Sequence, residues 1–365
     1  MTYDIAIVGA GASGLVAAIR LAQKGFKVVV IEQKPRIGQK ILVTGNGRCN
    51  LTNLDIKPSN YHSQTPEIVN QIISKYDSGY VIDFFASIGL LTKNKDNLVY
   101  PLSNKASSVL DCLINAVSKY KIDVFTDFSI NDIAQIEQKV KAKKLIIATG
   151  QAECGLNILK NLGHRIKKPY PALVQLRSDD LFIKGLKGVK VNCKIKAVQS
   201  NTNKILREEK GEMLFTDYGI SGIAVMQLSY LFSLYDNLHI EVDFIPDVPY
   251  KELEKVLELN IELNLTGIVD KKLGTRILKY SQNSHKKIVQ NLKSCIIKIS
   301  GHNGIKNAQV CGGGALLNEF NTNSLESIHA GNVYAVGEVL DAVGDCGGYN
   351  LHWAWATAML VGDSL

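Results

Sequence analysis

The stretch IAIVGAGASGLVAAIRLAQKGFKVVVI, Ile5–Ile31, decides the fold. Apolar residues over Tyr3–Val8 predict a buried strand, and the glycines of Gly9–Gly14 predict a tight turn. Leu15–Lys24 has the apolar spacing of a helix, and Phe26–Ile31 predicts a second apolar strand. A strand, a turn, a helix and a strand form a βαβ unit. The sequence therefore predicts an α/β fold on a parallel sheet with both faces buried.

The glycine turn has the pattern G-x-G-x-x-G, between a strand and a helix. Gly9 allows the turn, Gly11 lets a pyrophosphate approach the backbone, and Gly14 lets the helix pack closely on the strand. The helix amides and dipole then face the phosphate charge. Glu32 follows the second strand, eighteen residues after Gly14, and can accept both ribose hydroxyl hydrogens. The alternative is a glycine turn that only packs a helix on a sheet, but the full context favours dinucleotide binding.

Composition and charge restrict the class of protein. The chain has 365 residues, 46% hydrophobic and 21% charged, with a formal net charge of 42 − 34 = +8. This length suffices for two or three domains. The basic excess is spread along the chain without interleaved aromatics, so a nucleic-acid partner is not expected. No uncharged stretch has the length of a membrane span, and the N-terminus lacks the basic region of a signal peptide.

Seven cysteines, at positions 49, 112, 154, 193, 295, 311 and 346, are scattered and contain no C-x-x-C. This pattern argues against a disulfide framework, a zinc site and a dithiol redox motif. It favours a reducing compartment, and we expect a soluble cytoplasmic protein. The sequence also lacks a triad signature and metal-ligand spacing, so no metal is expected.

The rest of the chain changes character twice. Helical spacing recurs over 66–76, 80–88 and 105–120, and a polar hairpin-like stretch then leads to the buried strand of KKLIIATG, 143–150. From about Tyr170, short alternating segments predict an antiparallel β insertion. Helical patterns follow, over 249–265 and onward to ILKYSQNSHKKIVQNLKSCII. Glycine-rich α/β character returns in the last part of the chain.

Two strand ends favour FAD over NAD as the dinucleotide. LIIATG, 145–150, is a strand that ends in A-T-G, and VYAVGEVLDA, 333–342, is a strand whose terminal glycine precedes an acidic residue. Both features are familiar in flavoproteins of the glutathione-reductase type, in which FAD lies extended across the sheet. The unusual loop KILVTGNGRCNLTN, 40–53, begins with the strand-like run Ile41–Val43 and continues with many glycines and asparagines.

Together these segments resemble the BaiN-type family of NAD(P)/FAD-dependent oxidoreductases, a family that includes aminoacetone oxidases. The similarity covers nearly the whole chain, in order: GAGASGLVAA (9–18), the 40–53 loop, LIIATG, LFTDYGISG (214–222), QVCGGGAL (309–316) and GEVLDAVGDCGGYNLHWAWATA (337–358). The resemblance implies a Rossmann-like FAD-binding domain of the glutathione-reductase type at 1–169 and 308–365. It also implies a β-rich insertion at 170–246 and a small helical domain at 247–307.

The chain departs from the family pattern at several positions. Asn46 replaces the middle glycine of G-G-G-R-C-N, and Asp217 replaces a histidine in the TDYGISGI segment. Asp345 and Cys346 replace a common proline and threonine before GGYN, and Ile223 also replaces a proline. The change at Asp217 argues against a catalytic histidine at that position.

The resemblance also implies that the 40–53 loop and the 347–351 segment approach the isoalloxazine ring. A helix that begins near Asn350 would direct its positive end towards N1 and C2=O of the flavin. The residues expected to bind FAD are Gly9, Ala10, Gly11, Ala12, Ser13, Gly14, Glu32, Gln33, Lys34, Lys40, Gly45, Asn46, Gly47, Arg48, Cys49, Asn50, Phe128, Thr149, Gly150, Gly337, Glu338, Asp341, Gly348, Tyr349, Asn350 and Leu351.

Catalytic candidates are few, and each has a structural alternative. Arg48 could hold a substrate carboxylate or the flavin, or it could bind loop carbonyls. Cys49 is expected to be a packing thiol, with a redox pair to Cys346 as the alternative. His352, at the start of a helix, is more often a structural hydrogen-bonding group than a general acid. Tyr349 is a further candidate, and Tyr218 and His302 could also face a substrate. Trp353 and Trp355 are expected to pack.

The sequence leaves two enzyme subclasses open for this FAD-dependent oxidoreductase, with hydride transfer through flavin N5. A reductase would take hydride from NAD(P)H and pass it to a small activated unsaturated substrate. An oxidase would take hydride from an amine or alcohol and reduce oxygen. Only one dinucleotide fingerprint is present, because CGGGAL, 311–316, lacks the spacing and the ribose acid. NAD(P)H would therefore bind transiently. A flavoprotein that acts on RNA is the less favoured alternative.

Overall fold

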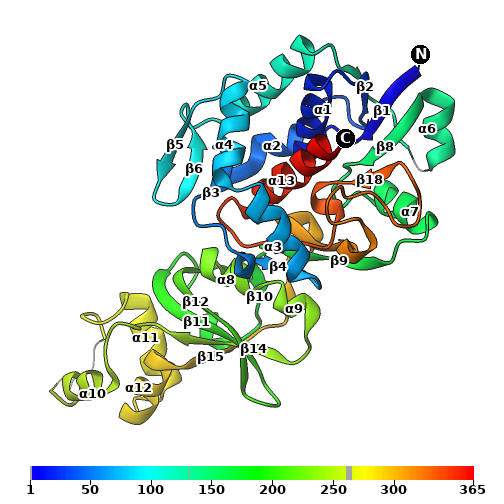
Figure 1. Cartoon of the computed structure of the whole chain (residues 1–365). Coiled ribbons are helices and arrows are strands. Elements are labelled where there is room, and N and C mark those ends of the chain that lie inside the picture. Colours follow the sequence, from blue (N-terminus) through cyan, green and yellow to red (C-terminus); the bar gives the residue numbers. More distant parts are fainter. Residues whose placement is uncertain (1, 131, 260–264) are drawn as a thin grey trace. The chain divides into compact units, whose positions relative to one another are not determined.

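A computed structural model describes residues 2–130, 132–259 and 265–365 (Figure 1). The chain forms two compact units. The first comprises residues 1–169 and 312–365, and the second comprises residues 170–311. The 170–246 segment and the 247–307 segment that follows it therefore both fall within the second unit.

A five-stranded parallel sheet forms the centre of the first unit. In spatial order its strands are β18 (Val333–Ala335), β8 (Lys141–Ile147), β1 (Thr2–Val8), β2 (Val28–Ile31) and β7 (Asp123–Phe125). All four residues of β2 are buried, as are Ile5 to Val8 of β1, because helices cover both faces of a parallel sheet. The predicted α/β fold with a parallel sheet is confirmed.

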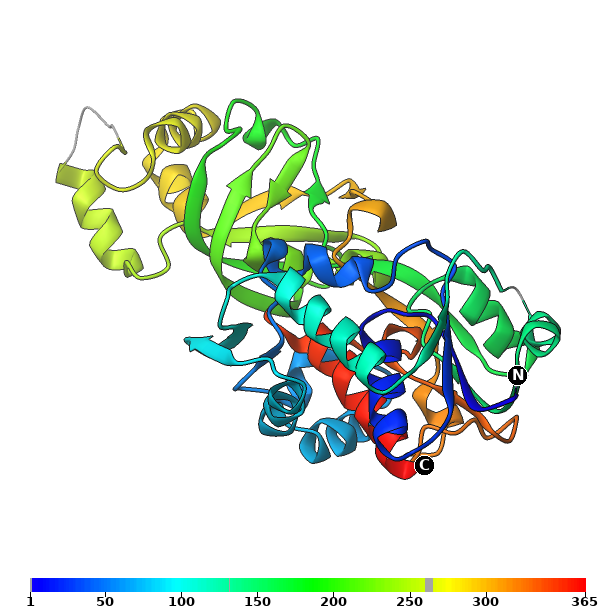
Figure 2. The same cartoon turned by 90° about the horizontal axis from the view of Figure 1, so that it is seen from above.

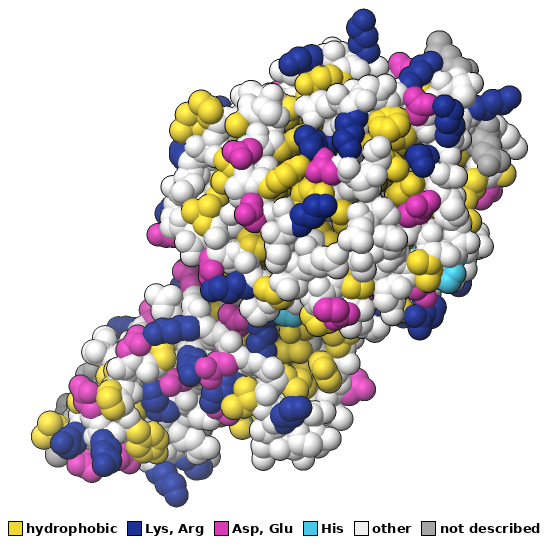
Figure 3. Space-filling model, in the orientation of Figure 1, with side chains coloured by type: hydrophobic (Ala, Val, Ile, Leu, Met, Phe, Trp, Pro, Cys, Tyr) yellow, Lys and Arg dark blue, Asp and Glu magenta, His cyan; other side chains and the backbone are white. Residues whose placement is uncertain are grey.

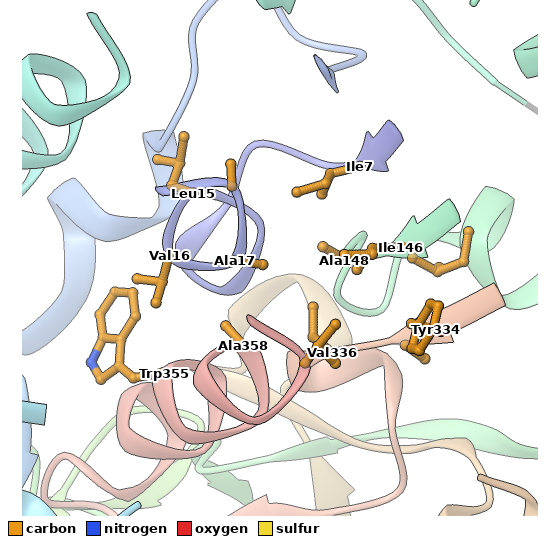
Figure 4. Close-up of a cluster of buried hydrophobic side chains, with 14 of the residues drawn as sticks. Ile7, Leu15, Val16, Ala17, Ile146, Ala148, Tyr334, Val336, Trp355 and Ala358 are labelled. Carbon is orange, nitrogen blue, oxygen red and sulfur yellow. The ribbon is translucent and has the colours of Figure 1, made fainter. Parts of the chain in front are cut away.

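Two helices that lie far apart in sequence pack together on this sheet. α1 (Ala12–Gln23) lies alongside α13 (Tyr349–Ser364) in both Figures 1 and 2. Figure 4 shows Ala17 of α1 and Ala358 of α13 between the two helices, where small side chains allow a close approach. Trp353 and Trp355 of α13 are 2% and 0% exposed, as expected of packing residues. A helix that is apolar on nearly every side, as α13 is, belongs inside the core.

The other elements of the first unit surround this core. They are α2 (Gln39–Val43), β3 (Thr52–Asn53), β4 (Tyr61–His62), α3 (Pro66–Lys75), α4 (Ser78–Ser87), β5 (Thr92–Lys95), β6 (Leu98–Pro101), α5 (Ala106–Lys119), α6 (Ile133–Lys139), α7 (Glu153–Asn161) and β19 (Val343–Gly344). The chain leaves the unit along β9 (Ile166–Ala172) and returns along β17 (Val310–Ala315), and these two strands pair. Smaller sheets join β3, β6 and β5, and also β19 and β4.

The second unit has its own hydrophobic core around a seven-stranded sheet. In spatial order its strands are β15 (Cys295–Lys298), β14 (Leu238–Asp243), β11 (Lys190–Gln199), β12 (Lys204–Phe215), β13 (Gly219–Ser221), β10 (Leu176–Arg177) and β16 (Gly301–His302). The helices are α8 (Ile223–Leu228), α9 (Leu231–Leu234), α10 (Tyr250–Leu259), α11 (Lys271–Tyr280) and α12 (His285–Lys293). The pairs are antiparallel, as the alternating pattern predicted.

Several local predictions were wrong. The strand-like run Ile41–Val43 is part of helix α2: only Ile41 is buried, whereas Val43 is 76% exposed, so the run has no buried face for a sheet. The hairpin-like stretch before β8 contains α6, which Asp132 caps through the amide of Gln135. Cys295–Lys298 is strand β15 and does not continue the helical module, because it pairs with β14. Of the helical prediction over 249–265, residues 260–264 lie outside the described residues.

Candidate functional site

Parallel strands bring distant segments of the first unit to one edge of the sheet. β1, β2, β8 and β18 end at Val8, Ile31, Ile147 and Ala335, and all four point the same way. The glycine turn, Glu32, the A-T-G segment and Gly337 follow these ends directly. In open α/β sheets this edge is where ligands bind, so the fold itself gathers these predicted residues into one region.

The glycines of the 9–14 turn differ in how much space surrounds them. A methyl group at Gly14 would overlap the carbonyl oxygen of Gly9, and one at Gly9 would lie 2.5 Å from the Ala148 carbonyl oxygen. Gly11 is different, because a methyl group there would have no described atom within 4 Å. Gly11 is also the N-cap of α1, whose first turn begins with Ala12 and contains no acidic side chain. Two glycines therefore allow packing, while Gly11 faces open space at a helix N-terminus.

Glu32 is fixed at the end of β2 by backbone amides. Its Oε2 accepts a hydrogen bond from Ala10 N at 2.8 Å, and its Oε1 accepts one from Lys34 N at 2.9 Å. Its carbonyl oxygen accepts from Phe128 N at 3.0 Å. Phe128 also lines a surface hollow with Ser129, Gln135, Gln138 and Lys139. The carboxylate is thus oriented beside the glycine turn, while Gln33 and Lys34 next to it are exposed.

Three more predicted residues meet beside the A-T-G segment. Lys40 Nζ lies 3.6 Å from Glu338 Oε2, and a methyl group at Gly150 would approach that same carboxylate oxygen to 3.2 Å. The lysine side chain is 75% exposed, so its charge stays available to an anionic ligand. Thr149 precedes Gly150 and donates its hydroxyl to the Gly150 carbonyl at 3.3 Å.

Ser13 and Gly337 connect the first helix to the last strand. Ser13 Oγ donates to the Val336 carbonyl at 3.4 Å, and a methyl group at Gly337 would lie 2.5 Å from Ser13 Oγ. The Gly337 amide in turn donates to Thr357 Oγ1 at 2.9 Å. Segments more than 300 residues apart in sequence are therefore in direct contact at this edge.

The 44–50 loop follows α2 with an unusual backbone. Gly45, Asn46 and Gly47 have φ values of 54°, 54° and 80°, and Cys49 has a φ of 57°. Asparagine is one of the few side chains that enter this left-handed region readily, which explains how Asn46 replaces the family glycine. Arg48 is exposed, and no described residue pairs with its guanidinium. The arginine is therefore available to a ligand.

The C-terminal helix begins in a cradle of hydrogen bonds. Gly348, with φ 95°, is the N-cap of α13, and a methyl group there would lie 3.0 Å from Asn50 Oδ1. Asn350 Oδ1 accepts from Gly344 N and Asn350 Nδ2 donates to Gly344 O, both at 2.8 Å. Asn50 Oδ1 is buried without a hydrogen-bond partner among the described residues. An unsatisfied buried acceptor of this kind needs a donor from a ligand or water.

His352 is a structural residue of this cradle. Its side chain is 0% exposed, and its Nδ1 lies 2.8 Å from Thr52 Oγ1. Burial lowers the pKa of His352 to about 4, so the ring is neutral at pH 7. We therefore retain the structural alternative for His352, because a fully enclosed ring does not reach a substrate. Leu351 beside it is half-buried.

Neither cysteine of the proposed redox pair is activated. Cys49 is fully buried, and burial raises the pKa of its thiol to about 11, against a smaller opposing effect of Thr44. Burial, with the nearby charge of Asp345, also raises the pKa of Cys346. Neither cysteine forms a disulfide. Since the thiolate is the reactive form, these shifts favour the packing alternative for Cys49.

The structure adds a histidine–aspartate pair that the sequence did not single out. His62 Nε2 lies 2.9 Å from Asp345 Oδ1, and the two side chains are 20% and 8% exposed. The pairing of β4 with β19 holds His62 beside Val343. Nearby, Tyr61 donates its hydroxyl to the Tyr349 carbonyl at 3.0 Å, and burial raises the pKa of Tyr349 to about 12. The departure from the family pattern at Asp345 was the one signal in the sequence for this pair, because no local pattern indicated His62.

The remaining predicted residues either belong to the second unit or form an ion pair with a lysine. Asp341 is 1% exposed and ion-paired at 3.3 Å with the Nζ atom of Lys167, a lysine of β9. Burial raises the pKa of Asp341, opposed by Lys167. Tyr218 and His302 belong to the second unit. Asp217 is exposed and paired with Lys187 Nζ at 2.7 Å.

Comparisons with known proteins agree with this arrangement. Residues 3–364 match the HI0933-like protein Rossmann domain. The chain is 36% identical to a 3-dehydro-bile acid delta(4,6)-reductase from Clostridium scindens, over 98% of both chains. It is 28% identical to a ribosomal RNA dihydrouridine synthase from Haemophilus influenzae, over 96% of both chains. The fold also resembles 3-ketosteroid delta1-dehydrogenase from Sterolibacterium denitrificans, with 11% identity, a TM-score of 0.53 and coverage of 100% and 99%.

The family match spans almost the entire chain, and the first relative is both similar in length and above 30% identical. The recognised resemblance is thus confirmed, as is the enzyme class. Among the described residues, no helix is long and apolar enough to cross a membrane. With its dinucleotide-binding turn at the ligand edge of a parallel sheet, the chain belongs to the HI0933-like Rossmann family of FAD-dependent oxidoreductases.

Proposed function

We propose that this protein uses NAD(P)H to reduce a carbon–carbon double bond conjugated to a carbonyl group in a small organic substrate. The observation that carries the proposal is the 36% identity, over 98% of both chains, to a bile acid delta(4,6)-reductase. The dihydrouridine synthase, a more distant relative over most of its length, is by its name also an enzyme that saturates a ring double bond. The alternative of an amine or alcohol oxidase has no such support.

The residues at the sheet edge fit an FAD molecule. Gly11 leaves space for a pyrophosphate at the N-terminus of α1, and the fixed carboxylate of Glu32 suits ribose hydroxyls. Lys40 offers a positive charge, and the unsatisfied Asn50 Oδ1 suits a donor on the flavin ring. When bound, FAD would supply the hydride chemistry of the reaction. Asp341, paired with Lys167, is not included among the residues that hold FAD.

Saturation of a conjugated double bond needs a proton as well as a hydride, and we assign the proton donor to His62. The Nε2 atom of His62 lies 2.9 Å from Asp345 Oδ1, so the carboxylate would hold the ring in place and Nδ1 would be the nitrogen that donates the proton. Asp345 lies two residues from the 347–351 segment that is expected to contact the flavin. Arg48, exposed and without a described partner, would bind the substrate carbonyl and stabilise the charge that develops there.

Anaerobic mixing tests the reaction in two steps. The flavin-loaded protein is mixed with NADH or NADPH, and the visible flavin absorbance is followed. We expect rapid bleaching, and then recovery of the absorbance when a cyclic α,β-unsaturated ketone is added, but not when the saturated ketone is added. Bleaching only by an amine or alcohol would contradict the proposal and support the oxidase. A protein that never takes up FAD would contradict the cofactor assignment.

Asp345→Asn tests the proton donor. The amide oxygen can still accept from His62, but the negative charge is lost, so we expect turnover of the unsaturated ketone to fall about a hundredfold. Bleaching by NAD(P)H should keep its rate, because that step needs no proton from His62. Asp4→Asn is the matched control: Asp4 pairs with Lys143 near the beginning of β1, away from the strand ends. An equal loss in both variants, or none in Asp345→Asn, would remove His62 from the reaction.

A second candidate function is reduction of a uridine in ribosomal RNA. The full-length similarity to the Haemophilus influenzae dihydrouridine synthase favours it. Against it, Lys and Arg side chains form no continuous track on the face drawn in Figure 3. Retention on an immobilised ribosomal RNA that weakens steeply with salt, together with a loss of uridine from that RNA, would favour this candidate. None of the seven cysteines forms a disulfide, which supports the proposed reducing, cytoplasmic compartment.

A further inference from the structure

A cluster of two histidines and a glutamate lies in the first unit, outside the residues discussed so far. His164 follows α7, Glu319 ends a short 3₁₀ turn over Leu317–Glu319, and His329 lies in the loop before β18. One potential ligand atom from each side chain lies within 4.8 Å of the other two. No local sequence pattern indicates this group, because the three residues are far apart along the chain.

The distances within the cluster suit a small metal ion. His164 Nδ1 lies 3.4 Å from Glu319 Oε2, and His329 Nε2 lies 3.6 Å from the same oxygen. Ligand atoms around a tetrahedral zinc ion, with bonds of about 2.0–2.1 Å, are roughly 3.4 Å apart. Two of the three distances between the potential ligand atoms are therefore already close to those around a tetrahedral zinc ion.

His164 has an unsatisfied nitrogen that points into the cluster. The residue is 3% exposed, and its Nδ1 has no hydrogen-bond partner among the described residues. Its Nε2 lies 2.8 Å from Ser327 Oγ, and its ring stacks on Phe320 with centroids 4.4 Å apart.

Glu319 is held as an oriented carboxylate. It is 5% exposed; its Oε2 accepts from Arg165 N at 2.7 Å, and its Oε1 accepts from the Arg165 guanidinium. The gap between Glu319 Oε2 and His164 Nδ1, 3.4 Å, suits a positive centre that contacts both atoms. That centre is either a proton on His164 Nδ1 or a metal ion.

We propose that His164, Glu319 and His329 form a binding site for a divalent transition-metal ion of the zinc class. Two imidazoles and one carboxylate suit zinc, whereas calcium and magnesium prefer oxygen ligands alone. The contact of His164 Nε2 with Ser327 Oγ, at 2.8 Å, fixes the ring so that Nδ1 faces the cluster. The side chain of His329 is 34% exposed, which gives the ion a route from solvent and leaves a fourth position for water. The ion would link three segments of the first unit.

Metal titration of the full-length, FAD-loaded protein tests the site. The protein is stripped with a chelator, dialysed and titrated with Zn²⁺ against a chromophoric chelator. We expect one tight equivalent per chain and a higher melting temperature with Zn²⁺. Co²⁺ in place of Zn²⁺ should give the strong visible bands of a four-coordinate ion, beyond the flavin absorption. His329→Ala should weaken the site at least tenfold, by about 1.4 kcal/mol. The fold should survive, because this side chain is partly exposed.

His285→Ala is the matched control, because His285 is an exposed histidine at the start of α12. It should bind Zn²⁺ as the unmodified protein does. Equal affinity in the unmodified protein and His329→Ala would overturn the proposal. So would the absence of a tight equivalent in both, in which case a proton holds His164 and Glu319 together. Neither result bears on the proposed reductase activity, because the experiment measures only metal affinity.

Discussion

Two regions of the first unit, both proposed to hold FAD at the sheet edge, are built in different ways. The 9–14 turn works through its backbone: glycines remove side chains, and the first turn of α1 supplies amides. The cradle around the start of α13 works through buried polar side chains, as in the contacts of His352 with Thr52 and of Asp345 with His62. The turn needs neighbours close in sequence, whereas the cradle needs partners about 300 residues away.

This difference also determines how each region responds to change. Backbone amides do not titrate, so the turn should be insensitive to pH but intolerant of added atoms. The cradle contains a buried histidine and a buried aspartate, so it should respond to pH. Substitutions should therefore test the contribution of the turn, and the pH dependence of stability should test the contribution of the cradle.

The largest effect is expected from Gly14→Ala in the turn. The new methyl group would overlap the Gly9 carbonyl oxygen, and Gly9 cannot retreat because its own amide donates to Ile31 O at 2.8 Å. Overpacking against fixed backbone should cost about 3 kcal/mol or more in the free energy of unfolding. Chemical denaturation followed by circular dichroism measures this cost, and FAD retention should also fall.

Gly79→Ala in α4 is the matched control for that experiment. Its methyl group would lie 3.3 Å from one described atom, Asp77 Oδ1, which caps α4 by accepting from Tyr80 N and would need to shift by only a few tenths of an ångström. We expect its free energy of unfolding to stay within about 1 kcal/mol of the unmodified protein. If Gly14→Ala were as mild as this control, the helix would not pack on the turn as closely as the structure indicates.

The pH response of the cradle should be nearly as large. The folded pKa of His352 is about 4, below the unfolded value of about 6.5. The unfolded chain therefore binds a proton first as pH falls, so stability is fully present above about 6.5 and is lost towards pH 4. The shift corresponds to about 3 kcal/mol. His352→Asn should remove this component, and its stability curve between pH 7 and 4.5 should be flatter than that of the unmodified protein.

The comparison of slopes matters here, because His352→Asn also loses packing and starts from a lower stability at every pH. Other groups that titrate in this range contribute equally to both curves and cancel. His285→Ala, which removes an exposed histidine, should run parallel to the unmodified protein. Parallel curves for His352→Asn and the unmodified protein would show that the His352 ring is not kept neutral in the cradle.

The same contrast explains what the sequence could predict. The turn, Glu32 and the strand ends were predictable because hydrophobic periodicity and glycine spacing are local signals. The pairing of His62 with Asp345 and the His164–Glu319–His329 cluster were not, since only tertiary folding brings these residues together. The ion pair of Asp341 with Lys167 from β9 was likewise not predictable, because the two residues lie 174 positions apart in the sequence. The apolar run Ile41–Val43 suggested a strand, but it is part of helix α2 and only Ile41 is buried.

The smallest effect on stability, and the sharpest test of the turn, is expected from Gly11→Ala. A methyl group there meets no described atom within 4 Å, and the backbone φ of −83° suits alanine, so the free energy of unfolding without FAD should change by less than about 0.5 kcal/mol. FAD affinity should nevertheless fall at least tenfold, or about 1.4 kcal/mol, because the methyl group occupies the space assigned to the pyrophosphate. Gly267→Ala, at another uncrowded glycine, should change neither quantity. Fluorescence titration with FAD measures the affinity. Unchanged affinity in Gly11→Ala would mean that the pyrophosphate does not approach this glycine, and that the cradle alone holds the cofactor.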